Sequence, residues 1–145
     1  MSSLRQFLLA KNYHRIKLKT TATNHLALKA TINGVEGDFI LDTGASSSCV
    51  GNEEAEHFNL FSEDSDIRAA GAGASNMLTR ISTKNNLQIG EWKKKNVDLV
   101  LFNLKHVNQA LENHDADPVH GIIGADILEK GKSIIDYQRK CLYLK

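Results

Sequence analysis

The chain has 145 residues, a formal net charge of +1 and only 6% aromatic side chains. This length is typical of one domain with a core that needs no disulfides. The near-neutral charge disfavours partners such as nucleic acid or an anionic membrane, and no apolar run approaches membrane-spanning length.

The first 25 residues are predicted to form an N-terminal arm or an extra strand, and residues 26–145 a single domain. The apolar stretch near Met1 is too short for a secretory signal. Cys49 and Cys141 suit a reducing compartment, which predicts a cytoplasmic protein with two buried thiols. A Cys49–Cys141 bridge stays open as the alternative.

The segment 26–41 predicts a β-hairpin. Apolar residues alternate with more polar ones from Leu26 to Ile32, which is the period of a half-buried strand. Asn33-Gly34 favours a type I′ turn. The returning strand, Val35 to Leu41, is apolar throughout its last residues, so we expect it to carry Asp42 into the interior of the domain.

The middle of the chain predicts more short strands. Ser47 to Val50 reads as a strand, and Asn52 can cap a short helix that continues to about Phe58. Residues 67–70 and 77–82 are expected to form strands on either side of the glycine-rich tip Gly71-Ala72-Gly73-Ala74-Ser75.

The last third of the chain adds strands and two short helices. The expected elements are a turn at Gly90-Glu91, a buried strand over 97–104, helices over 105–113 and 125–130 with Gly131 as a cap, and a hairpin of 134–135 with 141–144. Many short strands with few helices predict an all-β fold, a small closed barrel with one or two short helices and one lobe per chain.

Two segments carry a family resemblance. Ile40-Leu41-Asp42-Thr43-Gly44-Ala45 resembles the active-site signature of aspartic peptidases, and Ala45 looks like the retropepsin branch of that family. His120-Gly121-Ile122-Ile123-Gly124-Ala125-Asp126-Ile127-Leu128 resembles the second conserved segment of the same branch. Together, over roughly residues 26–145, they make the chain similar to a retropepsin-like aspartic peptidase with the acid-protease barrel.

The resemblance implies a peptide-cleaving enzyme that works as a homodimer. Two carboxylates that share one proton can activate water and polarise a peptide carbonyl. This chain has a single Asp-Thr-Gly, so the second carboxylate must come from Asp42 of a second copy across a two-fold axis. Interleaved terminal strands hold such dimers, which makes residues 141–145 the candidate here. The expected partners are a second copy and a peptide or protein substrate, with no metal or organic cofactor.

The resemblance also implies roles around Asp42, the predicted catalytic residue. Thr43 would hydrogen-bond across the axis, Gly44 would turn its N–H toward the carboxylates, and Ala45 would leave room for the substrate main chain. A flap would close over the peptide, and three further residues would pack beneath the site. The flap candidates are Gly71, Ala72, Gly73 and Ala74, and the packing residues are Ile122, Ile123 and Gly124.

Other interpretations remain open beside these. Asp42 could be a turn residue, the glycine-rich tip an ordinary loop, and Asp126 a structural carboxylate at a helix start rather than a catalytic one. The six histidines show no metal-binding spacing. Residues 103–118 are longer than a minimal retropepsin needs and could shape or block substrate access. The alternative function is a catalytically silent peptide-binding or dimerisation module on the same barrel.

Overall fold

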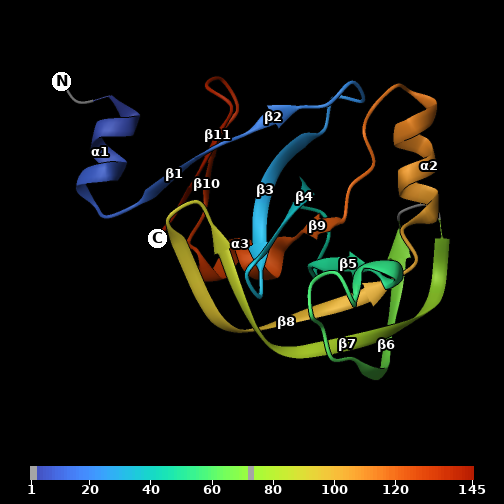
Figure 1. Ribbon diagram of the computed structural model, residues 1–145. Helices are drawn as coiled ribbons and strands as arrows, with labels where there is room; N and C mark the ends of the chain where they lie inside the picture. Colours follow the sequence, from blue (N-terminus) through green and yellow to red (C-terminus); the bar gives the residue numbers. More distant parts are fainter. Residues whose placement is uncertain (1–2, 72–73) are drawn as a thin grey trace.

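A closed ring of six strands forms the centre of the protein (Figure 1). The structure is a computed structural model that describes residues 3–71 and 74–145. Following the ring, the strands are β3 (Leu26–Ile32), β4 (Val35–Leu41), β9 (Gly121–Ile123), β5 (Cys49–Gly51), β8 (Trp92–Phe102) and β7 (Ala74–Ile89). The pairs Thr31 with Gln88 and Ile32 with Leu87 join β7 back to β3. This closure confirms the predicted all-β barrel.

The β3–β4 hairpin has the predicted bounds. Its turn residues Asn33 and Gly34 have φ values of 51° and 85°, as a type I′ turn requires. Burial alternates along β3, whereas the last three residues of β4 are all buried. The end of β4 is therefore buried in the barrel up to the residue before Asp42.

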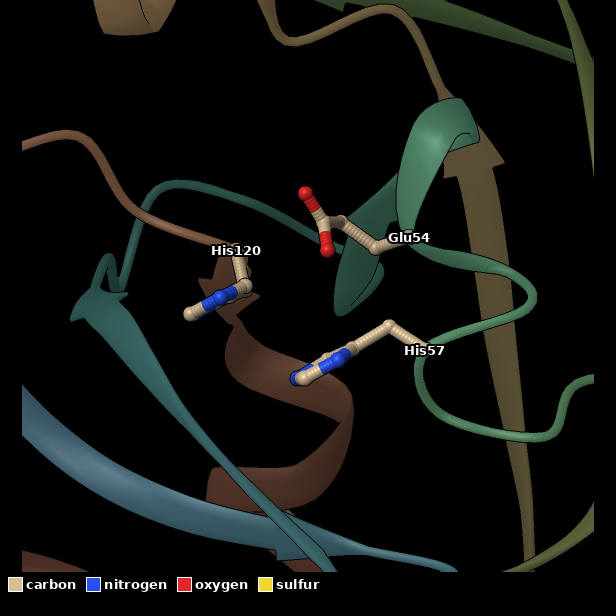
Figure 2. Close-up of side chains that lie close together, drawn as sticks. All are labelled: Glu54, His57 and His120. Atoms are coloured by element: carbon tan, nitrogen blue, oxygen red, sulfur yellow. The ribbon is translucent and has the colours of Figure 1, made fainter.

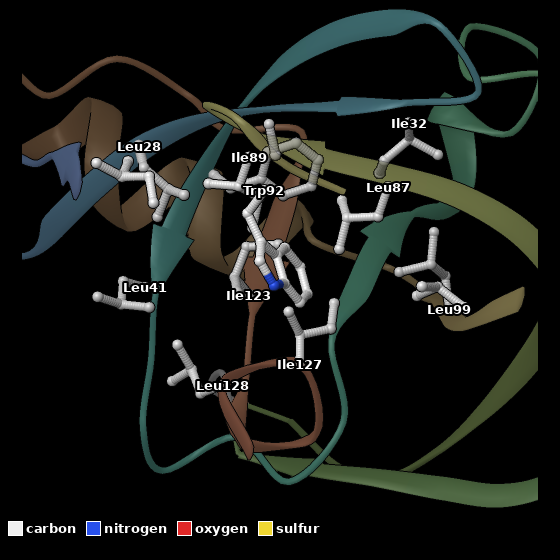
Figure 3. Packing of buried hydrophobic residues seen from close by; sticks show 14 of the residues in the cluster. Leu28, Ile32, Leu41, Leu87, Ile89, Trp92, Leu99, Ile123, Ile127 and Leu128 are labelled. Atoms are coloured by element: carbon white, nitrogen blue, oxygen red, sulfur yellow. The ribbon is translucent and has the colours of Figure 1, made fainter. Parts of the chain in front are cut away.

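Apolar side chains from the ring and from α3 (Ala125–Lys130) meet inside the barrel (Figure 3). The residues labelled there are Leu28, Ile32, Leu41, Leu87, Ile89, Trp92, Leu99, Ile123, Ile127 and Leu128. Trp92 is only 5% exposed, and its Nε1–H donates to the Lys145 carbonyl at 3.2 Å. α3 thus closes one side of the core.

Two strands form the hairpin expected on either side of the glycine-rich tip. β6 (Glu63–Gly71) runs antiparallel to β7, and Gly71 pairs with Ala74. The helix predicted over 52–58 is wrong: η1 (Asn52–Glu54) is a single 3₁₀ turn without a side-chain cap. A bond from the Leu60 N–H to the Ala55 carbonyl (2.8 Å) turns the chain there, and this brings Phe58 and Leu60 into the core.

The N-terminal segment is part of the fold. It forms α1 (Leu4–Ala10), β1 (His14–Lys17) and β2 (Lys19–Thr20), which extends the main sheet beside β3. With α2 (Lys105–Asn113) and α3, the described residues contain three α-helices rather than one or two. Within the same part of the chain, no helix is long and apolar enough to span a membrane.

A second sheet of three strands has the order β1, β11 (Cys141–Leu144) and β10 (Ile134–Asp136). β11 is the central strand, and all four of its residues are buried. Both of its edges are already hydrogen-bonded within the chain. The prediction that residues 141–145 interleave with a second copy is therefore wrong, because β11 has no open edge for another strand.

Candidate active site

The loop after β4 presents Asp42 at the surface. Phe39, Ile40 and Leu41 are 0%, 5% and 8% exposed, yet the next side chain is exposed. The expectation that Asp42 lies in the interior is therefore wrong for a single chain. The reason is local: the Asp42 N–H still bonds to the Ile123 carbonyl (3.0 Å), but the chain then turns out of the sheet.

The backbone around Asp42 holds its carboxylate. Gly44 N–H donates to Asp42 Oδ1 at 2.9 Å, and Ala45 N–H donates to the Asp42 carbonyl at 3.2 Å. A Cβ at position 44 would lie 3.3 Å from the same Oδ1, so glycine permits this close approach. Thr43 is exposed and Ala45 is half-buried. The carboxylate is thus fixed on one side and open to solvent.

The segment Ile122-Ile123-Gly124 lies against this loop. β9 runs parallel to β4, with Ile122 beside Ile40 and Ile123 beside Leu41. The Ala125 N–H donates to the Ala45 carbonyl at 2.7 Å, and a Cβ at Gly124 would lie only 2.5 Å from that carbonyl oxygen. Glycine at position 124 therefore lets the start of α3 contact the Asp42 loop directly.

Asp126 ties the loop to α3. Its Oδ1 accepts hydrogen bonds from the Ser48 N–H (2.9 Å), the Ser48 Oγ–H (2.7 Å) and the Ile127 N–H (2.8 Å). Ser48 Oγ in turn accepts from the Gly124 N–H at 2.8 Å. This geometry supports a structural carboxylate. Ser48 could not be predicted from the sequence, because chain spacing gives no sign that its hydroxyl faces residues 124–126.

The flap candidates are placed only in part. Gly71 and Ala74 face each other at the end of the β6–β7 hairpin. Ala72 and Gly73 lie outside the described residues. The strands predicted on either side of the tip are confirmed, and a flap role stays a prediction.

A cavity of about 800 Å³ opens beside Asp42, and we call it the Asp42 cavity. It lies between the turn 22–25, β4, β9 and α2. α2 is the helix of the segment 103–118, so this additional segment forms one wall of the space next to the carboxylate. The segment therefore lies where it can influence what reaches Asp42.

Glu54, His57 and His120 come together at the end of β5 (Figure 2). One ligand atom of each lies within 4.8 Å of the others, and the two imidazole rings stack with centroids 5.3 Å apart. Sequence spacing could not detect this group, because His57 and His120 are distant in the chain.

The chemistry of His120 does not suit a metal ligand. The Asp38 backbone N–H donates to His120 Nδ1 at 3.0 Å, so Nδ1 acts as the acceptor and Nε2 carries the proton of the neutral ring. A metal-binding histidine does the reverse and donates its second N–H to an oxygen. We therefore assign no metal to this cluster.

Both cysteines are buried and free, as predicted. Cys49 lies close to the Asp42 loop, where it pairs with Ile122 across β5 and β9. Burial raises the pKa of its thiol to about 12, so the thiol stays protonated near neutral pH. Cys49 therefore cannot serve as a nucleophile beside Asp42.

Comparisons with known structures show the same fold. A retropepsin-like aspartic protease from Rickettsia conorii shares 23% identity over 91% of both chains, with a TM-score of 0.63. The retroviral protease-like domain of Ddi1 from Leishmania major shares 19% over 83% of this chain and 88% of that one, with a TM-score of 0.55. EIAV protease, in complex with the inhibitor HBY-793, shares 18% over 72% and 86%, with a TM-score of 0.52.

Sequence comparison identifies the family. The search of curated proteins found no match. A family model described as aspartyl protease matches residues 28–127, which is more than half of the chain and includes both Asp42-Thr43-Gly44 and the Ile122-Ile123-Gly124 segment. Together with the barrel and the Asp42 loop, this match shows that the chain belongs to the aspartyl protease family.

Proposed function

We propose that the protein is an aspartic endopeptidase. Two copies would place their Asp42 carboxylates together across a two-fold axis, with a water molecule between them. The supporting facts are the family, the barrel and the Asp42 loop described above. Its substrates would be peptides or proteins.

The observation that carries this proposal is the half-open environment of Asp42. The side chain is exposed, while a backbone N–H holds one of its oxygens at 2.9 Å. Each chain has only one Asp-Thr-Gly. A fixed carboxylate at an open surface is what one half of a symmetric site requires, because an isologous contact brings the same residue from both copies together.

The reaction needs one proton shared by the two carboxyl groups, since neighbouring carboxylates cannot both ionise easily. The ionised Asp42 takes a proton from water as the water oxygen attacks the carbonyl carbon. The protonated Asp42 of the other copy donates to the carbonyl oxygen. The resulting tetrahedral intermediate collapses and its C–N bond breaks. The leaving amine takes the proton that the first Asp42 had removed from water, and a hydroxyl of the intermediate returns a proton to the second Asp42 as the new carboxyl group forms.

The neighbouring residues would support this chemistry. Thr43 is exposed beside Asp42 and would hydrogen-bond across the axis. Ala45 would leave room for the substrate main chain. The β6–β7 hairpin, with Gly71 and Ala74 paired near its end, would close over the bound peptide.

A peptide library tests the proposal. The purified chain is incubated with diverse peptides over a range of pH, and the cleaved bonds are mapped by mass spectrometry. We expect a bell-shaped pH dependence, loss of cleavage in Asp42→Asn, and no effect of chelators. Activity per chain should fall on dilution. Peptides that bind but are never cut would instead favour the silent binding module.

We also propose that the protein works in the cytoplasm. Two free, buried cysteines are compatible with a reducing compartment. Fractionation of cells, with an antibody against the chain, measures this directly.

A further inference from the structure

The Asp42 cavity combines an apolar floor with a fixed wall. Ile40, Leu111 and Ile122 line it and are 5%, 2% and 7% exposed. α2 is held in place because Leu111 packs in one cluster with Ile40, and Asn108 exchanges two hydrogen bonds with the backbone of Val119 (2.7 and 3.1 Å). The cavity is therefore built into the fold rather than formed by a loose loop.

Histidine side chains surround this floor. Three of the six histidines in the chain, His25, His106 and His114, line the cavity, and all three are exposed. His25 Nδ1 lies 2.7 Å from Thr23 Oγ1, a hydrogen bond that orients the ring. Imidazoles can donate hydrogen bonds when neutral and carry positive charge when protonated. Both forms suit an anionic group.

Two of these histidines come from α2 and its C-terminal cap. His106 and Ala110 lie one turn apart on the same face of α2, and His114 is the residue that caps the helix. All three line the cavity, and the small Ala110 between the histidines leaves room for a ligand group. The carboxylate of Glu112 lines a different cavity, on another face of α2.

In the described lining of the cavity, the histidines are the only residues that can hold an acidic group by charge. Among the described residues that line it, Asp42 carries the only carboxylate, and neither lysine nor arginine is present. An incoming acidic side chain must keep its charge near the histidines and away from Asp42. Glutamate does this better than aspartate, because its longer stem can lie along the apolar floor.

We propose that the Asp42 cavity binds a glutamate side chain of the substrate close to the cleaved bond, with His25, His106 and His114 as the residues that select it. This inference rests on the proposed function. In the symmetric dimer the cavity occurs twice, so a glutamate would be accepted on either side of the bond.

Matched peptides test the inference. Labelled peptides that differ only in Glu, Gln, Asp or Leu at one position beside the cleaved bond are compared in two assays. Fluorescence anisotropy measures binding to the full chain, and mass spectrometry measures kcat/KM. A charge-assisted hydrogen bond corresponds to roughly a 10- to 100-fold preference. We expect Glu to exceed Gln by about 10-fold or more, with Asp between them, and the preference to fall as salt is raised.

Histidine variants test whether the preference for glutamate arises in the Asp42 cavity. The Glu:Gln ratio should approach one in the triple variant His25→Ala/His106→Ala/His114→Ala, and the single variants guard against a folding failure of the triple. His14→Ala, on β1 and away from the cavity lining, serves as the control and should keep the ratio. A ratio, unlike a rate, is insensitive to a general loss of activity.

The two assays separate the possible failures. Preferential binding of Glu peptides without cleavage would support the cavity assignment and refute the peptidase function. Cleavage of all four peptides at similar rates would refute the glutamate preference and leave the peptidase function intact. A Glu:Gln ratio that survives the histidine variants would also overturn the assignment.

Discussion

Replacing Ser48 with alanine removes the hydroxyl that joins the Asp42 loop to α3. The side chain is fully buried. Its Oγ donates to Asp126 Oδ1 at 2.7 Å and accepts from the Gly124 N–H at 2.8 Å. After the substitution Asp126 keeps its two backbone donors, but the buried Gly124 N–H loses its acceptor.

The expected cost follows from these two bonds. A buried donor without a partner costs roughly 1–3 kcal/mol, and a hydrogen bond to a charged group contributes about 1.5–3 kcal/mol. Because the two contributions overlap, we expect a loss of about 2–4 kcal/mol in the free energy of unfolding. With a urea m-value of about 2 kcal/mol/M, the unfolding midpoint should fall by roughly 1–2 M.

Urea unfolding followed by the fluorescence of Trp92 measures this change. Trp92 is the single tryptophan and is buried, so its emission reports loss of the core. Ser46→Ala, an exposed serine of the same loop, is the matched control and should unfold like wild type. Asp126→Asn keeps an acceptor oxygen and should lie between the two. If Ser48→Ala and Ser46→Ala unfold at the same urea concentration, the hydroxyl does not tie the loop to α3.

Further predictions concern the proposed site and the sheet at the chain ends. Asp42→Asn should abolish cleavage with an unchanged circular dichroism spectrum. When equal amounts of variant and wild-type chains are mixed, about a quarter of the dimers should keep both carboxylates. A cleavage rate proportional to the amount of wild-type chain would contradict a site shared between two copies. Deleting residues 141–145 should unfold the domain, because Leu142 and Leu144 are fully buried; a folded truncated chain would refute this. Burial raises the pKa of the Cys49 thiol to about 12, so Cys49 should resist thiol reagents at pH 7–8 until the chain unfolds. Mass spectrometry of the labelled chain detects the modification. Gly71→Val/Gly73→Val should lower kcat/KM with little change in stability, and normal kinetics would exclude a flap.

Local patterns predicted much of the fold. The alternation of Leu26 to Ile32 and the Asn33-Gly34 turn were sufficient for the β3–β4 hairpin, because the signal for both lies within a few residues. The bounds of α2 and α3 were likewise predictable. The capping box of Ser3 and Gln6 is a recognisable helix-start pattern, so the beginning of α1 also has a local signal.

Long-range arrangement was harder to predict. The pairing of β1 with β11 and the contact of Ser48 with Asp126 each join segments that are distant in the chain. Such contacts produce no periodic pattern in the sequence from which they could be predicted. The exposure of Asp42 was mispredicted for a related reason: burial of a strand says nothing about where the chain turns after it. The histidines of the Asp42 cavity likewise come together only through the packing of α2 on β4.

The central place of β11 has a consequence for how the chain folds. Its partner β1 pairs His14 with Leu144, almost the full length of the chain apart, and Leu8 of α1 packs with Cys141 and Tyr143 of β11. Contacts between such distant residues form slowly, because a long loop must close before they can contribute. α1 and β1 are synthesised before β11 but must wait for it. The two ends of the chain therefore complete the fold together, and a nascent chain cannot reach its final packing until residues 141–144 are free to pair.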